Sequence, residues 1–337
     1  MKKLFSVLLV AVMMLSLVAS ASAAEIWSSG KTVYVDVGAR AGGGTDLLIR
    51  YMTKALGELN PGVNFVVNNY DVGDVGLAHA AYAKPDGLTL SVISVGNTSN
   101  YHAGTSNFKP LEMFKIAAKV VNGGPQAFVA TAGAPYSNMA ELVDYIRSGE
   151  KKLKIGVQLG GVSHFAWLNT FNAIDPELNN MVNYVQAGGE ADKLTNIASG
   201  SIDLANCSMN NSIAYEADGK LVVLGTIGPD AATREATAAL VGQELAENYA
   251  SMPEQNISYC LNAGTYIVVP VGCSDEVVEY INAKFMELVG NQTYEDGMRT
   301  MGQFSGVKNV ADSLADYEAE VAETLAVMEE LNMVVVK

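Results

Sequence analysis

The sequence predicts an α/β protein made of two halves, each with a parallel sheet flanked by helices. Apolar runs rich in β-branched residues alternate with stretches of helical period along most of the chain. A strand–helix–strand order of this kind places consecutive strands parallel, with the helices on the faces of the sheet. With 337 residues, the chain is also long enough for two domains with separate cores.

The N-terminus has the pattern of a secretory signal peptide. Lys2 and Lys3 precede an apolar run from Leu4 to Val18, and the small residues Ala21 to Ala24 precede Glu25. The apolar run is shorter than the ~20 residues that span a bilayer, and the cleavage point has no cysteine for a lipid anchor. We therefore expect residues 1–24 to be removed and a soluble, periplasmic protein to begin at Ala24 or Glu25.

The first half reads as alternating strands and helices. Its predicted strands are Val33 to Val37, Asn64 to Val67 and Leu88 to Ser94, and its predicted helices are Asp46 to Leu59 and Gly76 to Ala83. A turn at Lys84-Pro85-Asp86-Gly87 precedes the third strand.

The second half repeats the alternation. Its predicted strands are 126–130, 154–157, 182–185 and 202–204, and its predicted helices are 137–147, 163–171 and 192–198. We place the crossings between the halves near Asn122 to Gln126 and near Thr226 to Ala231. Helices at 276–288 and 313–331 then return to the first half. Residues 25–125 plus 228–337 are expected to form lobe I, and residues 126–227 lobe II.

The mature chain is strongly acidic. Without Lys2 and Lys3, 19 of the 21 basic residues remain against 36 acidic ones, a formal net charge of −17. Nucleic-acid binding needs clustered lysine and arginine, so the composition argues against it. An anionic ligand would also be repelled by the overall field, and a site for an anion must therefore be built locally.

Two glycine-rich loops, each between a strand and a helix, are the main candidate sites. The first is Gly38-Ala39-Arg40-Ala41-Gly42-Gly43-Gly44-Thr45-Asp46 and the second is Gly156-Val157-Gln158-Leu159-Gly160-Gly161-Val162-Ser163-His164. Bare amides at a helix N-terminus form an anion site, although a glycine-rich turn of this kind can also be purely structural. Neither loop has the spacing of a nucleotide-binding motif. The carboxyl ends of strands in open α/β sheets are where ligands gather, so one loop from each half can face the other across a cleft.

A third candidate is the polar cluster Asn206-Cys207-Ser208-Met209-Asn210-Asn211-Ser212, whose side chains are either turn residues or donors to a ligand.

The three cysteines, Cys207, Cys260 and Cys273, form no metal or redox pattern. Cys260 and Cys273 are the only pair close in sequence, and small buried thiols are the simpler interpretation.

These segments resemble the tripartite tricarboxylate transporter substrate-binding family, also called the Bug receptors. The segment Ala41-Gly42-Gly43-Gly44-Thr45-Asp46 at a helix start is similar to that family's signature. Lys84-Pro85-Asp86-Gly87-Leu88-Thr89-Leu90 resembles its "PDGYTL" turn and strand, Gly160 to His164 its second ligand loop, and Gly200-Ser201-Ile202-Asp203 its "GQVD" strand entry. The resemblance covers nearly all of the mature chain.

The resemblance implies a two-lobed, type II periplasmic-binding-protein fold, with two mostly parallel sheets and a ligand cleft between the lobes. It implies capture of a small organic anion, a carboxylate, for the membrane permease subunits of a transporter by a monomeric receptor without cofactor or metal. The implied ligand contacts are Gly42, Gly43, Gly44, Thr45 and Asp46 in the first loop and Gly161, Val162, Ser163 and His164 in the second, and the strand end at Ser94 to Thr98, with Asn97 and Thr98, is the third wall. The residues themselves add Ser208 of the polar cluster and Arg40, which we expect to be at most an accessory to a grip by the backbone. The chain departs from the family at Gly38 to Ala41 and at Cys207-Ser208, so the distal group of the ligand stays open.

Three alternatives remain beside this reading. A hydrolase is disfavoured because Ser163 and His164 are adjacent on a helix start and point in different directions, and because the Gly-x-Ser-x-Gly elbow is absent. A metal-binding receptor is disfavoured because His79, His102 and His164 lack metal-ligand spacing. A receptor that presents its ligand to a membrane sensor fits the same fold.

Overall fold

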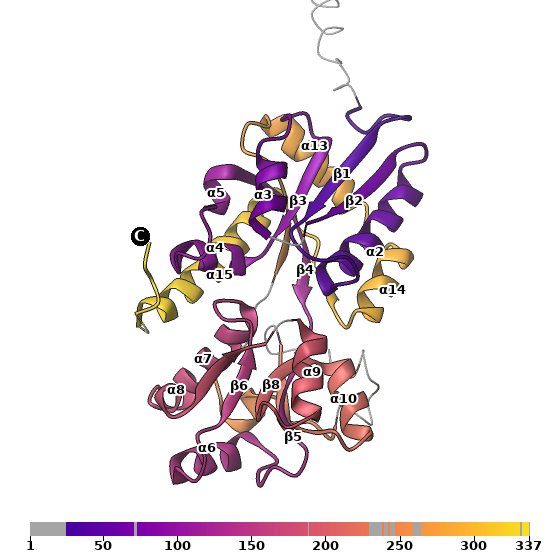
Figure 1. The fold of residues 1–337 in the computed structure, drawn as a ribbon. Helices are drawn as coiled ribbons and strands as arrows, with labels where there is room; N and C mark the ends of the chain where they lie inside the picture. Colours follow the sequence, from indigo (N-terminus) through magenta and orange to yellow (C-terminus); the bar gives the residue numbers. More distant parts are fainter. Residues whose placement is uncertain are drawn as a thin grey trace, which may run out of the picture.

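The structure is a computed structural model that describes residues 25–70, 73–187, 189–228, 238, 242, 247–258, 264–330 and 332–336. The predicted signal peptide, Cys260 and part of the second predicted crossing lie outside these residues. Figure 1 shows two lobes, one above the other, which confirms the predicted two-lobed α/β fold.

Lobe I is built on a sheet with the strand order β11-β4-β10-β3-β1-β2. Its strands are β1 (Thr32–Val37), β2 (Asn64–Asn69), β3 (Thr89–Ile93), β4 (Phe114–Gly123), β10 (Thr265–Pro270) and β11 (Phe304–Ser305). Its helices are α2 (Gly44–Leu59), α3 (Gly73–Ala81), α4 (Val95–His102), α5 (Pro110–Met113), α13 (Asp275–Met286), α14 (Gln292–Thr300) and α15 (Val310–Glu330).

Lobe II is built on a sheet with the strand order β7-β6-β8-β5-β9. Its strands are β5 (Gln126–Thr131), β6 (Lys154–Val157), β7 (Asn183–Gln186), β8 (Leu204–Ser208) and β9 (Leu221–Ile227). Its helices are α6 (Met139–Ser148), α7 (Val162–Ile174), α8 (Leu178–Met181), α9 (Glu190–Ala198) and α10 (Met209–Ala217), with a 3-10 turn η2 (Pro253–Gln255).

Both sheets are mixed, where the sequence predicted mostly parallel ones. In lobe I, β1 pairs in parallel with β2 and β3, while β10 runs antiparallel to β3 and β4. In lobe II, β6 pairs in parallel with β7 and β8, while β5 runs antiparallel to β8 and β9. The reversed strands β5 and β10 are those that enter each sheet from the other lobe, so they lack the crossover helix that makes neighbours parallel.

The crossing from β4 to β5 requires a glycine. A Cβ built on Gly124 would lie 1.8 Å from the carbonyl oxygen of Gly302, so a residue with a side chain would clash at this position. The predicted lobe boundaries remain a prediction, but Met252 and Ile257, which they assign to lobe I, pack in the lobe II core.

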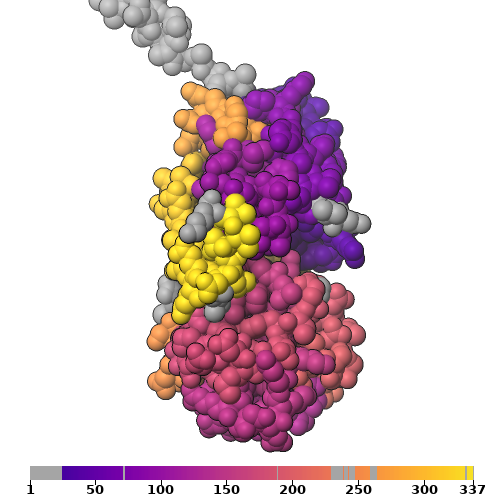
Figure 2. Space-filling view, turned by 60° about the vertical axis from the view of Figure 1, so that its left-hand side comes forward, coloured from indigo at the N-terminus to yellow at the C-terminus, as the bar shows by residue number. Residues whose placement is uncertain are grey.

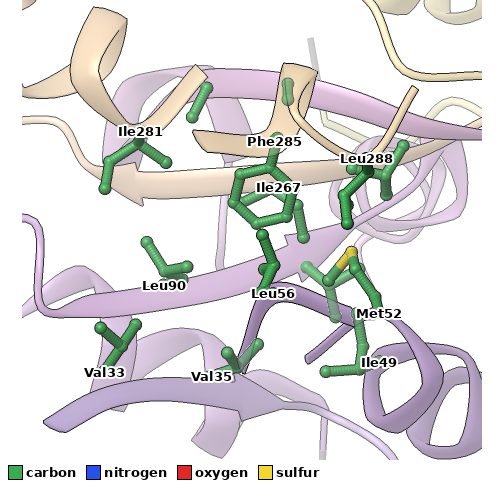
Figure 3. Packing of buried hydrophobic residues seen from close by; sticks show 14 of the residues in the cluster. Val33, Val35, Ile49, Met52, Leu56, Leu90, Ile267, Ile281, Phe285 and Leu288 are labelled. Atoms are coloured by element: carbon green, nitrogen blue, oxygen red, sulfur yellow. The ribbon is translucent and has the colours of Figure 1, made fainter. Parts of the chain in front are cut away.

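The lobe I core lies between the sheet and α2, α13 and α14. Apolar residues at helical spacing on α2, among them Ile49, Met52 and Leu56, meet β1 and β10, and Phe285 closes the cluster from α13 (Figure 3). All four of these side chains are fully buried. This packing fixes the position of the α2 N-terminus, since α2 lies along the sheet that carries the first glycine loop.

The C-terminal helix joins the lobes. Met328 near the end of α15 is fully buried against Phe165 and Leu168 of α7 in lobe II. The following segment returns to lobe I, where the amides of Val335 and Val336 donate to the carbonyl of His102 at 2.8 and 3.0 Å. Figure 2 shows this yellow segment lying over both the purple lobe I and the pink lobe II.

Of the cysteines that the structure describes, Cys207 and Cys273 are buried free thiols. No helix in the described ranges is long and apolar enough to cross a membrane.

Candidate functional site

A pocket of about 250 Å³ lies at the carboxyl ends of β1 and β3, where α7 of lobe II approaches lobe I. It is lined by Gly38, Ala39, Thr45, Gly73, Leu77, Val92, Ile93, Ser94, Asn97, Val162 and Thr265. The two lobes are in contact near this pocket, where Gly160 of lobe II packs against Asn100 on α4 of lobe I. A Cβ added to Gly160 would lie 3.3 Å from the side-chain oxygen of Asn100.

The first glycine loop presents an uncapped helix start. Gly42 has a φ of +77°, which favours glycine, and the amide of Gly43 donates to the carbonyl of Arg40 at 3.1 Å to close the turn. Gly43 is the N-cap of α2 and supplies no side-chain hydrogen bond. The amides of Gly44, Thr45 and Asp46 occupy the first turn of the helix, where backbone donors have no intrahelical partner. The loop therefore offers donors and the positive end of a 16-residue helix beside the pocket.

Asp46 holds this loop together from inside lobe I. Its buried carboxylate accepts from the Gly42 amide at 2.7 Å and from Asn69 Nδ2 at 2.9 Å, and Arg50 Nε lies 2.9 Å away. Burial opposes ionisation, but the hydrogen bonds from Arg50, Gly42 and Asn69 outweigh it and lower the pKa of Asp46. Asp46 does not line the pocket, and its hydrogen bonds give it a supporting position in the loop, while its predicted contact with a ligand stays a prediction.

The second glycine loop is braced in a similar way. Ser163 Oγ accepts from the Gln158 amide at 2.9 Å, and His164 Nδ1 accepts from the Gly160 amide at 3.2 Å. Burial lowers the pKa of His164 to about 4, so its ring is neutral near pH 7. Gly161 caps α7 without a side-chain hydrogen bond, and Val162 is the residue of this loop that lines the pocket.

The third wall is the start of α4. The amide of Ser94 donates to Asn97 Oδ1 at 2.9 Å, and both residues line the pocket. Thr98 points away from it, since its buried hydroxyl lies 2.7 Å from the Tyr317 hydroxyl on α15. The side-chain oxygen of Asn97 is thus used within α4, whereas no described residue accepts a hydrogen bond from its side-chain nitrogen.

The polar cluster predicted after the fourth strand of lobe II splits between β8 and α10. Ser208, the last residue of β8, donates through its amide and its hydroxyl to Glu190 Oε1 at 3.0 and 2.5 Å. Ser208 thus contacts a carboxylate of the protein itself and is not part of the pocket wall.

Of the predicted contacts, the structure brings Thr45, Asn97 and Val162 together around the pocket. The others lie outside its lining: Arg40, Gly42, Gly43, Gly44, Asp46, Thr98, Gly161, Ser163, His164 and Ser208. The sequence analysis did not predict that Gly38 and Gly73 pack against each other in the pocket wall. A Cβ on Gly38 would lie 2.9 Å from the Gly73 backbone, so two bare backbones meet there. No local pattern near Gly73 signals this contact.

Among the described residues, the pocket lining contains no lysine, arginine or histidine. Donors in the pocket are therefore backbone amides, the hydroxyls of Thr45, Ser94 and Thr265, and the amide of Asn97. Ser163 and His164 each hydrogen-bond to their own loop and not to each other, which is not the geometry of a nucleophile and its base. Within the part of the chain that the structure describes, no group of histidine, cysteine or acidic side chains could hold a metal ion.

Comparisons with known proteins identify the family of this chain. The model of the tripartite tricarboxylate transporter family receptor matches residues 53–325. The chain is 25% identical over 198 residues to a UPF0065 protein of Bordetella pertussis. This match covers 57% of the chain and 59% of that relative, so the chain spans less than two thirds of its length.

Three solved structures share the fold. The periplasmic binding protein BugD is 18% identical with a TM-score of 0.72, covering 90% of this chain and 98% of its own. Rpa4515 of R. palustris, solved with adipate, is 21% identical with a TM-score of 0.73, covering 89% and 96%. MatC of Rhodopseudomonas palustris, solved with malate, is 19% identical with a TM-score of 0.70, covering 88% and 98%. The chain belongs to the tripartite tricarboxylate transporter receptor family.

Proposed function

We propose that this protein is an exported, monomeric solute receptor. It captures a small organic carboxylate between its lobes and delivers the carboxylate to the membrane permease subunits of a tripartite tricarboxylate-type transporter. Membership of the receptor family supports the transport role. The adipate and malate bound to two proteins of the same fold support a small carboxylate as ligand.

The observation that carries the proposal is the pocket lined by hydroxyls, an amide and two uncapped helix starts. A carboxylate there accepts hydrogen bonds from the first-turn amides of α2, and the dipole of the helix favours its charge. Hydrogen bonds to a charged acceptor contribute roughly 1.5–3 kcal/mol each. Several of them could supply micromolar affinity, about −8 kcal/mol, without a cationic side chain.

The pocket is small, which favours small ligands. Its volume of about 250 Å³ is just below the usual range for small-molecule sites, roughly 300–1,000 Å³. The bound molecule is expected to leave chemically unchanged, because the geometry around Ser163 and His164 positions no nucleophile.

A thermal-shift screen of ligand-stripped protein against small carboxylates tests the proposal. At ~100 times its dissociation constant a ligand stabilises the native state by roughly 2.7 kcal/mol, so at least one carboxylate should raise the melting temperature by several degrees. Thr45→Val should lower the affinity for that ligand, because it removes a hydroxyl from the pocket wall. The matched control is Thr195→Val on the exposed face of α9. Turnover of the ligand, or no shift with any carboxylate, would refute the proposal.

A further inference from the structure

The side chain of Glu190, the first residue of α9, accepts hydrogen bonds from the donors at the start of α10. Its Oε1 accepts from the Ser208 amide at 3.0 Å, from Ser208 Oγ at 2.5 Å and from Asn211 Nδ2 at 2.7 Å. These are the groups with which a helix start binds an anion. In this protein an internal carboxylate already fills that position.

This carboxylate stands on the edge of lobe II that faces lobe I. β6 and β8 are parallel neighbours, so the loop that follows β6 and leads to Val162 leaves the sheet at the same edge as Ser208 at the end of β8. Val162 lines the pocket. Asn210, two residues after Ser208, has its side-chain nitrogen 3.1 Å from where a Cβ on Gly302 of lobe I would lie.

The charge of Glu190 is not cancelled by an ion pair with the nearest lysine of its helix. Lys193, one turn further along α9, is buried and directs its ammonium to the carbonyl of Asn206 in β8. Among the described residues, none donates a hydrogen bond to Glu190 Oε2. One oxygen of a partly exposed carboxylate therefore stays open beside the cleft.

We propose that Glu190 determines which carboxylates this receptor accepts, selecting a small amino-carboxylate and rejecting dicarboxylates. The inference rests on the proposed function, in which the α2 amides of lobe I hold the ligand carboxylate. The amine cation at the other end of the ligand then meets Glu190 in lobe II. A dicarboxylate would place its second negative charge against Glu190, and such like-charge contact is an efficient way to exclude a wrong ligand.

The test is calorimetric titration of ligand-stripped protein with two matched series. One series contains α- and ω-amino acids of three to six carbons, and the other contains dicarboxylates of the same chain lengths. The wild type should bind at least one amino-carboxylate at least tenfold more tightly than the dicarboxylate of equal length. Glu190→Gln keeps a side-chain oxygen for the three donors and removes the charge, so this preference should shrink at least tenfold. Asp192→Asn, an exposed neighbour on the same helix, should leave the preference unchanged.

The outcomes separate the two proposals. If the wild type binds dicarboxylates as tightly as amino-carboxylates, this inference fails while carboxylate capture stands. If Glu190→Gln weakens both series equally, Glu190 only caps α10 and the inference fails in the same way. If no compound of either series binds, this inference is overturned, and the proposed function is overturned as well when the wider carboxylate screen also gives no shift.

Discussion

His164 should make the stability of this protein depend on pH in a predictable window. Its ring is buried at the start of α7 and uses Nδ1 to accept from the Gly160 amide, which requires the neutral form. The perturbation we propose is His164→Asn, since an asparagine oxygen can take the place of Nδ1 and accept the same hydrogen bond without titrating.

The magnitude follows from the two pKa values. Burial lowers the pKa of His164 to about 4 in the folded protein, against about 6.5 in the unfolded chain. Between these values the unfolded chain binds a proton that the native protein does not, so stability falls as the pH drops from 6.5 to 4. At 1.36 kcal/mol per pKa unit, the full loss is about 3 kcal/mol.

The assay is urea denaturation of the wild type and His164→Asn at a series of pH values from 7.5 to 4. Other titrating groups are common to both proteins, so the difference between their unfolding free energies isolates His164. This difference should shift by about 3 kcal/mol against the wild type as the pH falls. A difference that stays constant across the series would refute the buried, neutral histidine.

Three further changes test the supports of the site. Asp46→Ala removes the acceptor shared by Gly42 and Asn69, so denaturation should show a loss of at least ~2 kcal/mol and calorimetry a weaker ligand affinity; wild-type values for both would contradict the supporting role. Gly42→Ala forces an L-residue to a φ of +77° and should lower the unfolding free energy by about 1–2 kcal/mol in the same assay. Gly44→Ala is the control and should be tolerated, because its Cβ would contact no other atom. Equal losses for the two variants would argue against the loop geometry. Met328→Ala should lose ~2–5 kcal/mol of unfolding free energy, since it empties a buried contact between α15 and α7; a loss below ~0.5 kcal/mol would show that the lobes are not joined there.

The fold was predictable where the hydrophobic period was strong. The helix expected at 46–59 is α2, found at Gly44–Leu59, because Ile49, Met52 and Leu56 repeat at helical spacing and pack on the sheet. α4 and α10 were not predicted as helices, since their sequences are polar and lack that period. Tertiary contacts supply what the pattern lacks: Thr98 of α4 bonds to Tyr317, and Glu190 holds the first turn of α10.

The site was predictable at the level of loops and not of side chains. Glycines before a helix predict a helix start with free amides, and both loops have this form. Which residue faces the ligand depends on how distant segments meet, as Gly38 meets Gly73. The direction of a side chain such as Asp46 or Ser208 depends on partners at 23 and 18 residues' separation, Asn69 and Glu190, which no local pattern reveals.

The central claim is that backbone amides and small polar groups hold the ligand carboxylate without a cationic side chain. Arg40 is the cation of the first glycine loop; it is exposed and does not line the pocket. The most direct measurement is calorimetric titration of Arg40→Ala with a carboxylate that binds the wild type. We expect a loss of affinity of less than tenfold, below about 1.4 kcal/mol. Abolished binding in a folded Arg40→Ala protein would mean that an arginine clamp holds the ligand and would contradict the account.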